Sequence, residues 1–553
     1  MKRFTWLLLV SILLAACTPR AAAPTPTLTA TLLPPTATAT ATLTASPTAV
    51  PASQQWWGKA VFYEIFVRSF YDSNGDGIGD FNGITEKLDY LQSLGINAIW
   101  LMPIHPSPSY HGYDVIDYFK VNPDYGTMDD FRRLVAEVHK RDMHLIIDLV
   151  LNHTSSQNPW FIDANSDPQS AYRNWYIWSD TNPSYLSPTG GPAWHKGLHG
   201  YYYGIFSDSM PDLNYRNPAV TAEMVKVVQF WLKDVGIDGF RLDAAKHLIE
   251  EGLKQENTQS THYWLKQFYT YYKGLNPQAF TVGEIFNAGA SLAKTYTGNQ
   301  MDEVFSFELA SGFVNSAQAE VRSSVDSGVQ FTLNSLPDGP YATFLTNHDQ
   351  NRVMSSMYGN VEEAKMAAAL MLTSPGTPFI YYGEEVGMEG EKPDPQIRMP
   401  MQWSAEANAG FTTGTPWEAN TNDYSRANVA TELTDPQSLL YFYRTLLRLR
   451  NENPVFSAPG IGLVTSSDSG VYAAFRYSDQ ERVLVVINLT KNPISQYTLS
   501  QPKSTLPDGS YHLQALLGTE SPADLNVTGG KVGDYVPLAE LPAYSVHIYQ
   551  IEP

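Results

Sequence analysis

Four apolar runs in the sequence carry a carboxylate at or near their carboxyl end. They are Leu145–His153 (LIIDLVLNH), Gly236–His247 (GIDGFRLDAAKH), Phe280–Glu284 (FTVGE) and Phe344–Asp349 (FLTNHD). Burying such a charge without a partner is expensive. Successive parallel strands of a barrel bring their carboxyl ends together, and barrel enzymes place their chemistry there. The recurrence of the pattern therefore predicts one shared acidic site.

The second of these runs contains an ion pair at short spacing. Phe240 and Leu242 alternate with Arg241 and Asp243, which predicts a strand with its charged residues on one face. A nearby positive charge lowers a carboxyl pKa, so we expect Arg241 to keep Asp243 ionised. An ionised carboxylate is what a covalent nucleophile requires. Taken alone, the pair is also compatible with a structural strand-end ion pair.

The four runs together resemble the signature regions of the α-amylase superfamily, glycoside hydrolase family 13, in the order of that family. Two further stretches agree with it, Met210–Asn214 (MPDLN) and Gly376–Glu385. The MPDLN sequence is similar to that of a bacterial intermediate subfamily with lipoprotein α-amylases. The resemblance extends over residues 55–553. It implies a TIM (β/α)8 barrel with an inserted domain B after strand 3 and a C-terminal antiparallel β-sandwich domain.

The resemblance also implies roles for individual residues in a retaining double displacement. Asp243 would be the nucleophile, Glu284 the general acid and base, and Asp349 would grip the sugar hydroxyls as the ring flattens. The carboxyls of the nucleophile and the acid are then expected about 5 to 5.5 Å apart. The substrate-binding residues that the family implies are Tyr113 and Asp114 of the HGYD segment, His153, Arg241, Lys246, His247, His348, Asp394 and Arg398.

Two features of the sequence bear on specificity. Lys246 and His247 follow the nucleophile as in α-amylases that grip glucose units on the leaving-group side, and Ala244 stands where enzymes specific for α-1,6 links tend to carry valine. We therefore expect an endo-acting amylase that cleaves α-1,4 bonds of starch and maltooligosaccharides. Asp114 departs from this interpretation, because with a partner such as Arg398 it can close the non-reducing end in exo-acting enzymes.

Three alternatives to the endo-amylase stay open at this point. The first two are an exo-acting α-glucosidase or oligo-1,6-glucosidase and a trehalose-forming isomerase of the same superfamily. The third, from another class, is a non-catalytic starch-binding surface lipoprotein. The presence of all three carboxylates argues against the third.

One loop has the composition of a calcium site. Oxygen-bearing side chains alternate with other residues, mostly glycines, at Asp72, Asn74, Asp76 and Asp80, and Ile78 would add its carbonyl. Hard oxygen ligands of this kind suit Ca²⁺. Gly83 stands where an EF-hand would place its glutamate, so the loop is not an EF-hand; a polar turn without metal is the alternative.

A second calcium ion is implied by the resemblance alone. Asn152 and Asp212 match the family's ligands between domains A and B, together with the carbonyl of His247. Some members with related sequences lack that ion.

Composition excludes some classes of partner. The 553 residues are 43% hydrophobic, which allows a large core, and their formal net charge is −20. Such an acidic chain is not expected to bind nucleic acid or an anionic membrane surface, whereas a neutral glucan fits it. We expect a monomer. Cys17 is the single cysteine, so no intrachain disulfide can form.

The N-terminus has the features of a lipoprotein signal. Lys2 and Arg3 precede the apolar run Leu7–Leu14, which is too short for a mature membrane span, and Leu14–Cys17 (LAAC) resembles a bacterial lipobox. We expect a signal peptide over 1–16, an acylated Cys17, and a Thr/Pro/Ala-rich tether over 17–52. The mature chain would be lipid-anchored at the cell surface or in the periplasm. An ordinary signal peptide with an incidental cysteine is the alternative.

Alternating strand and helix patterns predict where these residues are held. Domain A is expected over 53–151 and 217–453, domain B over 152–216, and the β domain over 454–553. Strands are expected at 61–67, 97–102, 145–151, 240–243, 280–284, 303–307, 341–347 and 378–382, and helices at 84–94, 128–141, 219–235 and 438–450. After Pro454 short alternating strands at 471–477, 482–489 and 544–551 predict an antiparallel sandwich. Most aromatic residues of the insertion are expected to pack in its core.

Overall fold

The structure is a computed structural model that describes residues 55–337, 341–421, 423–518 and 521–552. The predicted signal peptide, Cys17 and the whole of the predicted tether lie outside the described residues. Within the described part, none of the helices combines the length and the apolar character that crossing a membrane requires.

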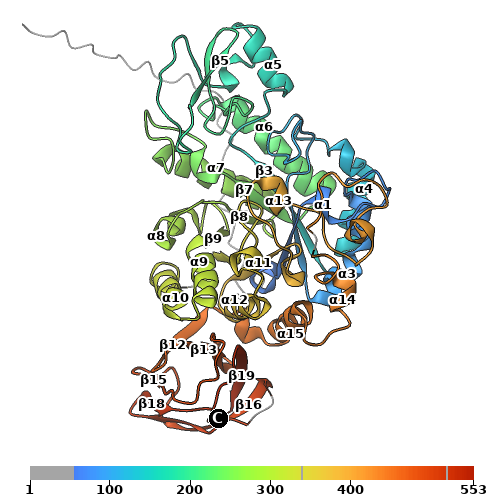
Figure 1. Ribbon diagram of the computed structural model, residues 1–553. Helices are drawn as coiled ribbons and strands as arrows, with labels where there is room; N and C mark the ends of the chain where they lie inside the picture. Colours follow the sequence, from blue (N-terminus) through green and yellow to red (C-terminus); the bar gives the residue numbers. More distant parts are fainter. Residues whose placement is uncertain (1–54, 338–340, 422, 519–520, 553) are drawn as a thin grey trace, which may run out of the picture. The chain divides into compact units, whose positions relative to one another are not determined.

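A closed barrel of eight parallel strands forms the centre of the catalytic region (Figure 1). Its strands, in spatial order, are β1 (Phe62–Ile65), β2 (Ala98–Leu101), β3 (His144–Val150), β7 (Gly239–Asp243), β8 (Phe280–Gly283), β9 (Glu303–Phe305), β10 (Tyr341–Thr343) and β11 (Thr377–Tyr381). Nearly every strand residue is buried, because side chains fill the barrel on one face and helices cover the other. The predicted barrel is confirmed.

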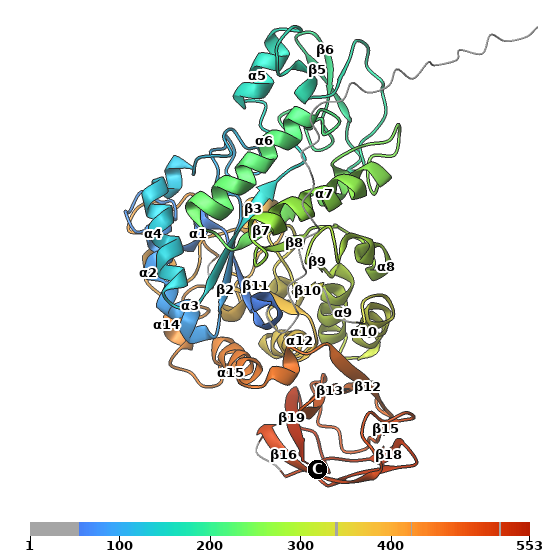
Figure 2. The ribbon, with the colours of Figure 1, turned by 180° about the vertical axis from the view of Figure 1, so that it is seen from behind.

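Helices connect successive strands and surround the barrel (Figure 2). They are α1 (Val67–Phe70), α2 (Phe81–Glu86), α3 (Leu88–Leu94), α4 (Met128–His139), α6 (Pro218–Gln229), α7 (Gln259–Leu275), α8 (Ala290–Ala293), α9 (Phe307–Gln318), α10 (Ser323–Ser335), α11 (Val353–Ser356), α12 (Val361–Thr373), α13 (Asp394–Ile397), α14 (Val429–Glu432) and α15 (Leu439–Glu452). The helix predicted at 84–94 is two helices, since the chain leaves helical geometry at Lys87. The one predicted at 219–235 ends in a π-helical turn at Phe230–Val235.

A small subdomain lies between β3 and α6 in sequence. It holds α5 (Pro159–Ser166) and an antiparallel sheet of β4 (Trp178–Ser179), β6 (Gly200–Tyr203) and β5 (Trp194–Gly197). Its aromatic side chains pack on one another as expected: the rings of Trp160 and Trp175 are 4.9 Å apart, and those of Trp194 and Tyr203 are 5.3 Å apart.

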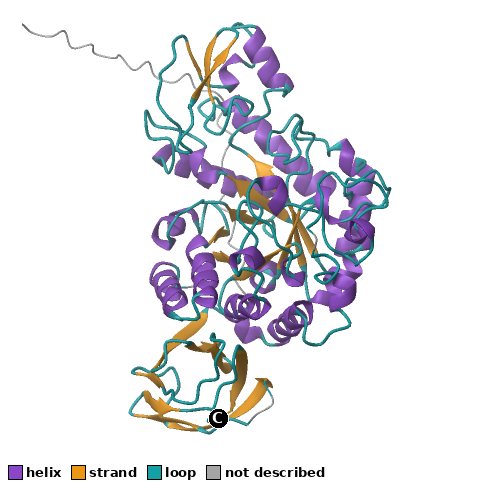
Figure 3. Cartoon of the chain, in the orientation of Figure 1, coloured by secondary structure: helices purple, strands orange, loops and turns teal. Residues whose placement is uncertain are grey.

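The C-terminal region consists of eight antiparallel strands (Figure 3). They are β12 (Gly460–Ser466), β13 (Val471–Tyr477), β14 (Arg482–Asn488), β15 (Leu499–Gln501), β16 (Gly509–Leu517), β17 (Leu525–Thr528), β18 (Lys531–Tyr535) and β19 (Ser545–Glu552). The predicted antiparallel domain is confirmed, and its two sheets join into a closed barrel. They join because β12 pairs with both β13 and β15, and β16 pairs with both β19 and β17.

Candidate active site

Arg241 on β7 is the centre of the predicted acidic site. Its Nη1 donates to Asp148 Oδ1 at 2.8 Å and to Asp243 Oδ1 at 2.6 Å, and its Nη2 donates to Glu284 Oε2 at 2.8 Å. Arg241 as a whole is 1% exposed. Three of the four apolar runs therefore meet at one cation, as the recurrence of the pattern predicted.

Strand geometry explains why these groups converge. Arg241 is the register partner of Asp148 on β3 and of Val282 on β8, so adjacent strands present their side chains at the same level of the barrel. Glu284 follows β8 directly, and the backbone N–H of Ala244 donates to Glu284 Oε2 at 3.1 Å. A backbone N–H and a guanidinium therefore hold one carboxyl from two sides.

Three buried carboxyls share one guanidinium charge, and burial has the largest effect on the pKa of each. Burial raises the pKa of Asp243, and the contact with Arg241 opposes this without outweighing it. Burial likewise raises the pKa of Glu284, and it raises that of Asp148 to about 7. The expected lowering of the Asp243 pKa is therefore wrong in its net direction, because burial is the larger effect and Arg241 divides its charge.

His348 and Tyr113 form the wall of the site beside this cluster. The His348 Nε2 lies 2.7 Å from the Tyr113 hydroxyl, which donates to Asp148 Oδ2 at 3.2 Å. His348 Nδ1 donates to Glu64 of β1. Burial lowers the pKa of His348, but Asp349 and Glu64 outweigh it and raise the value to about 9. The imidazole is therefore cationic at neutral pH.

Glu64 was not singled out from the sequence. It is the only charged residue in the apolar run Val61–Val67, and a lone charge inside a buried strand was the available signal.

Asp349 is held on the other side of the site by Arg398. Arg398 Nη2 donates to Asp349 Oδ1 at 2.9 Å and to Asp394 Oδ2 at 3.0 Å, and Nε donates to the His348 carbonyl at 2.8 Å. Burial raises the pKa of Asp349, yet the charges of His348 and Arg398 outweigh it and hold that pKa well below its usual range. Asp349 is thus ionised, whereas burial raises the pKa of Glu284 above its usual value.

Asp114 does not meet Arg398 in the described chain. Its Oδ1 accepts hydrogen bonds from the hydroxyls of Ser107 and Ser109, the former at 2.6 Å, and His111 Nδ1 lies 3.9 Å away, where burial lowers the pKa of the imidazole. Both serines were missed in the sequence. The ion pair that would close the non-reducing end is therefore not formed.

Lys246 and His247 lie beside Glu284 on the segment after β7. Lys246 Nζ donates to the Phe286 carbonyl at 3.1 Å and pairs with Glu256 at 2.8 Å. His247 Nδ1 lies 3.2 Å from the Gln255 carbonyl. This side of the site thus holds the ammonium of Lys246 and the buried imidazole of His247, whose pKa is lowered by burial.

His153 follows β3 and contacts both Tyr113 and Phe206. Its Nε2 is 3.1 Å from the Tyr113 carbonyl, and its ring packs edge-on against half-exposed Phe206 at 5.2 Å. The Phe206 ring is also 6.0 Å from His247, so it lies close to both predicted sugar-binding histidines. Phe206 was not predicted, because a single phenylalanine in an aromatic-rich insertion gives no signal of its own.

In the predicted calcium loop, side-chain oxygens accept hydrogen bonds from backbone N–H groups of the same loop. Asp72 Oδ1 accepts from the N–H of Asn74 at 3.0 Å, Asn74 Oδ1 from that of Asp76 at 2.9 Å, and Asp76 Oδ1 from that of Ile78 at 2.9 Å. Asp80 accepts from the N–H of Ser73 and Gly83. Asp72 Oδ1 and Asp80 Oδ1 each accept two hydrogen bonds, whereas Asn74 Oδ1 and Asp76 Oδ1 each accept one and keep a lone pair that suits a hard cation. Among described residues, no three acidic, histidine or cysteine side chains form a metal-binding group.

The second predicted metal position has an unpartnered polar atom. Asn152 Oδ1 is buried and accepts no hydrogen bond within the described chain. Asp212 is buried beside it, and burial raises the pKa of its carboxyl well above the usual value. A buried carboxylate next to a free amide oxygen fits a cation, which would compensate both.

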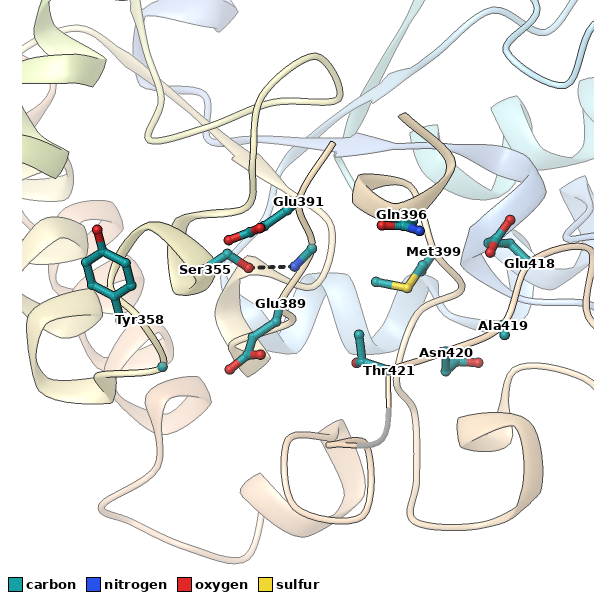
Figure 4. A pocket seen from close by; sticks show the side chains of 12 residues that line it. Ser355, Tyr358, Glu389, Glu391, Gln396, Met399, Glu418, Ala419, Asn420 and Thr421 are labelled. Atoms are coloured by element: carbon teal, nitrogen blue, oxygen red, sulfur yellow. Dashed lines mark hydrogen bonds between the residues drawn. The ribbon is translucent and has the colours of Figure 1, made fainter. Parts of the chain in front are cut away.

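A hollow of about 560 Å³ lies next to α13, which carries Asp394 (Figure 4). Glu389 and Glu391 line it from one segment and Glu418 from the facing one, while the Gly390 N–H donates to Ser355 Oγ at 2.8 Å. None of the predicted site residues lines this hollow. It is therefore separate from the cluster around Arg241.

Comparison with known proteins agrees with this geometry. The model of the α-amylase catalytic domain matches residues 64–458. Alpha-amylase 3 of Dictyoglomus thermophilum is 40% identical over 445 residues, 79% of this chain and 86% of that protein. An oligo-1,6-glucosidase of Heyndrickxia coagulans is 34% identical over 522 residues, 80% of this chain and 93% of that protein. The crystal structure of the alpha-amylase from H. orenii gives a TM-score of 0.78 at 38% identity and covers 89% of this chain and 99% of that one.

The names of these relatives differ in the bond that they cleave, so they establish the class of enzyme and leave its specificity open. The family match covers most of the described chain and includes every strand of the parallel barrel except the first two residues of β1. Together with the cluster of carboxyls around Arg241, this shows that the chain is a glycosidase of the α-amylase family, glycoside hydrolase family 13.

Proposed function

We propose that the chain is an endo-acting α-amylase that cleaves internal α-1,4 bonds of starch and maltooligosaccharides with retention. The observation that carries the proposal is the position of Asp114, which Ser107 and Ser109 hold while Arg398 pairs with Asp349 and Asp394. A glucan chain then meets no ion pair across the non-reducing end, and internal bonds can reach the carboxyls.

The arrangement around Arg241 supports a double displacement. Asp243 attacks the anomeric carbon, and Glu284 donates a proton to the departing oxygen, then accepts one from the water that hydrolyses the glycosyl-enzyme. The raised pKa of Glu284 suits a general acid, while Asp349, whose pKa is well below its usual range, is available as an anion to accept hydrogen bonds from sugar hydroxyls. That Asp243 and Glu284 bind the two ends of one guanidinium agrees with the short carboxyl separation of retaining enzymes, about 5 to 5.5 Å. That separation stays a prediction.

The direct test follows soluble starch with the wild-type chain and Asp243→Asn. An endo-amylase removes the iodine colour rapidly, yields mixed maltooligosaccharides and releases the α-anomer first by NMR, and Asp243→Asn does none of this. Glucose that accumulates while the colour persists would replace the endo assignment by an exo-glucosidase. No products from the wild type would favour the starch-binding lipoprotein.

We also propose that the enzyme binds Ca²⁺ at the Asp72–Asp80 loop and between Asn152, Asp212 and the His247 carbonyl. The loop's oxygen donors and the unpartnered Asn152 Oδ1 support this. Calcium that binds only the folded chain would raise the free energy of unfolding, by about 2.7 kcal/mol per site at a calcium concentration of a hundred times Kd. A chelator should lower Tm, with metal analysis giving two ions in the wild type and one in Asp76→Ala or Asp212→Asn. No bound calcium in the wild type would refute both sites.

A lipid anchor at Cys17 is the third proposal. It rests on the LAAC sequence at Leu14–Cys17 and on the low-complexity segment that follows it. Two acyl chains hold a protein at a membrane more firmly than one. Expression in bacteria with labelled palmitate should label the wild type and not Cys17→Ser, and the variant should leave the membrane fraction. Equal labelling of both chains would disprove the anchor.

A further inference from the structure

Residues of α6 and α7, two helices that lie side by side in Figure 2, line a hollow of about 680 Å³ outside the cluster around Arg241. Its lining residues are Tyr215, Arg216, Pro218, Thr221, Ala222, Ile249, Glu251, Gln259, Ser260, Tyr263, Trp264 and Gln267. None of the residues predicted for catalysis, substrate or metal belongs to this set. The hollow therefore needs an explanation of its own.

One ridge of α7 forms the polar wall of this hollow. Gln259, Tyr263 and Gln267 follow one another at intervals of four residues, which places them on one face of the helix, about 6 Å apart along its axis. All three side chains are exposed, and the Tyr263 ring is 64% exposed. Within the described chain, none of the three has a hydrogen-bond partner for its side chain. An aromatic face thus stands between two free amides.

The opposite wall of the hollow, formed by α6, has short side chains, and its one hydroxyl already has a hydrogen-bond partner. Pro218, Thr221 and Ala222 of α6 are short side chains, and the Thr221 hydroxyl accepts the indole N–H of Trp264 at 2.8 Å. Trp264 in turn packs on the buried ring of Tyr215 at 4.4 Å. Short residues opposite a projecting ring leave room for a flat ligand on that ring.

The charged groups at the edge of the hollow are also paired. Arg216 Nη1 donates to Glu250 at 2.5 Å, and Glu251 Oε1 accepts from the N–H and hydroxyl of Ser260 at 2.9 and 2.7 Å. Arg216 and Glu251 are the charged residues of the lining, and each of them already has a hydrogen-bond partner within the described chain. A neutral ligand with an apolar face and many hydroxyls matches such a lining better than an ionic one.

We propose that this hollow, the α7 ridge site, binds a glucan chain remote from the catalytic carboxyls. The apolar face of a glucose ring stacks on Tyr263, and its hydroxyls bond the amides of Gln259 and Gln267. The choice of ligand rests on the proposed α-glucan substrate. A site of this kind holds a long polymer or a starch granule on the enzyme while another segment is cleaved, and it leaves short oligosaccharides unaffected.

The test uses Asp243→Asn to prevent turnover and compares two added changes, Tyr263→Ala and Tyr441→Ala. Tyr441, on α15, is an exposed tyrosine outside the hollow and serves as the matched control. Loss of the stacked ring should weaken binding to starch granules and to long amylose about tenfold for Tyr263→Ala and not for Tyr441→Ala. In the otherwise wild-type enzyme, kcat/KM on maltotriose should stay the same for both. Unchanged melting temperatures show that both variants are folded.

Other outcomes separate this proposal from the proposed function. If Tyr263→Ala and Tyr441→Ala bind granules equally well, the ridge site is wrong, even where the wild type hydrolyses starch. If the wild type hydrolyses nothing but granule binding depends on Tyr263, the ridge site stands and the amylase assignment fails. If sedimentation shows that Tyr263→Ala turns a dimer into a monomer without weakening granule binding, the hollow is an interface between copies and the ridge site is refuted.

Discussion

Arg241 Nη1 donates to Asp148 Oδ1 at 2.8 Å, across the neighbouring strands β7 and β3 on which the two residues are register partners. This bond takes part of the guanidinium charge away from Asp243 and Glu284, which bind the same side chain. Asp148 therefore influences the protonation of two carboxyls that it need not itself contact.

Asp148→Asn tests this sharing of charge. Without the third carboxylate, Arg241 interacts more strongly with Asp243 and Glu284, so both pKa values should fall and the whole pH profile of kcat/KM should move to lower pH. A displacement of about one pH unit corresponds to about 1.4 kcal/mol of charge interaction. The measurement is kcat/KM on maltooligosaccharides between pH 4 and 10.

A loss of activity without movement of either limb would contradict this account. It would mean that Asp148 only fixes the position of Tyr113, whose hydroxyl it accepts at 3.2 Å. Tyr113→Phe is the matched control, because it removes that hydroxyl and leaves the three carboxyls in place.

Glu64→Gln should lower the alkaline limit of activity. Glu64 accepts from His348 Nδ1, and its charge helps to raise the pKa of His348 to about 9. A neutral glutamine withdraws that charge, so the imidazole should lose its proton at lower pH and with it the cation beside Asp349. An NMR titration of the histidine signal reports the shift directly. An unchanged histidine pKa would show that Asp349 alone sets it.

The product pattern should change when Asp114 is released. In Ser107→Ala/Ser109→Ala the Asp114 carboxylate loses both hydroxyl donors. A buried carboxylate without a partner is costly, so pairing with a cation becomes favourable. Arg398 is the nearby candidate, and their pairing would narrow the non-reducing end. We expect more glucose and maltose from amylose and slower loss of iodine colour. Products in wild-type proportions would show that the serines do not determine endo action.

The barrel and its acidic site could be predicted from the sequence because both depend on local pattern. Apolar runs ending in Asp243 and Glu284 identify strand ends, and a parallel barrel brings such ends together. The net direction of the Asp243 pKa shift could not be predicted, because it depends first on how completely the fold buries that carboxyl. The register that brings Asp148 to the same guanidinium also appears only when β3 and β7 are paired.

Contacts between segments that are distant in the sequence could not be predicted either. Glu64 lies 284 positions before His348, so no local spacing relates them. The C-terminal barrel closes because β12 and β16 each pair on both sides, and period-two alternation is the same for an open sandwich strand and a strand of a closed barrel.

Stability should fall as the pH rises from about 4.5 to about 8, because of Glu303 at the start of β9. The side chain is buried, Oε1 accepts from the Thr377 hydroxyl at 2.7 Å, and Oε2 has no partner in the described chain. Burial raises its pKa from 4.5 to about 8. The folded protein therefore holds a proton that the unfolded chain loses near pH 4.5. The unfolding free energy then falls as pH rises across that interval, by on the order of a few kcal/mol.

Glu303→Gln removes this titration and keeps the acceptor for Thr377. We expect its Tm to match the wild type near pH 5 and to exceed it above pH 8, while the exposed Glu391→Gln follows the wild type throughout. The comparison is made by calorimetry at both pH values in the same buffer series. Because Glu303 lies at the amino end of its strand, opposite the carboxyl-end site, kcat should not change. A difference in Tm that is the same at pH 5 and pH 9 would show that the effect is packing rather than charge.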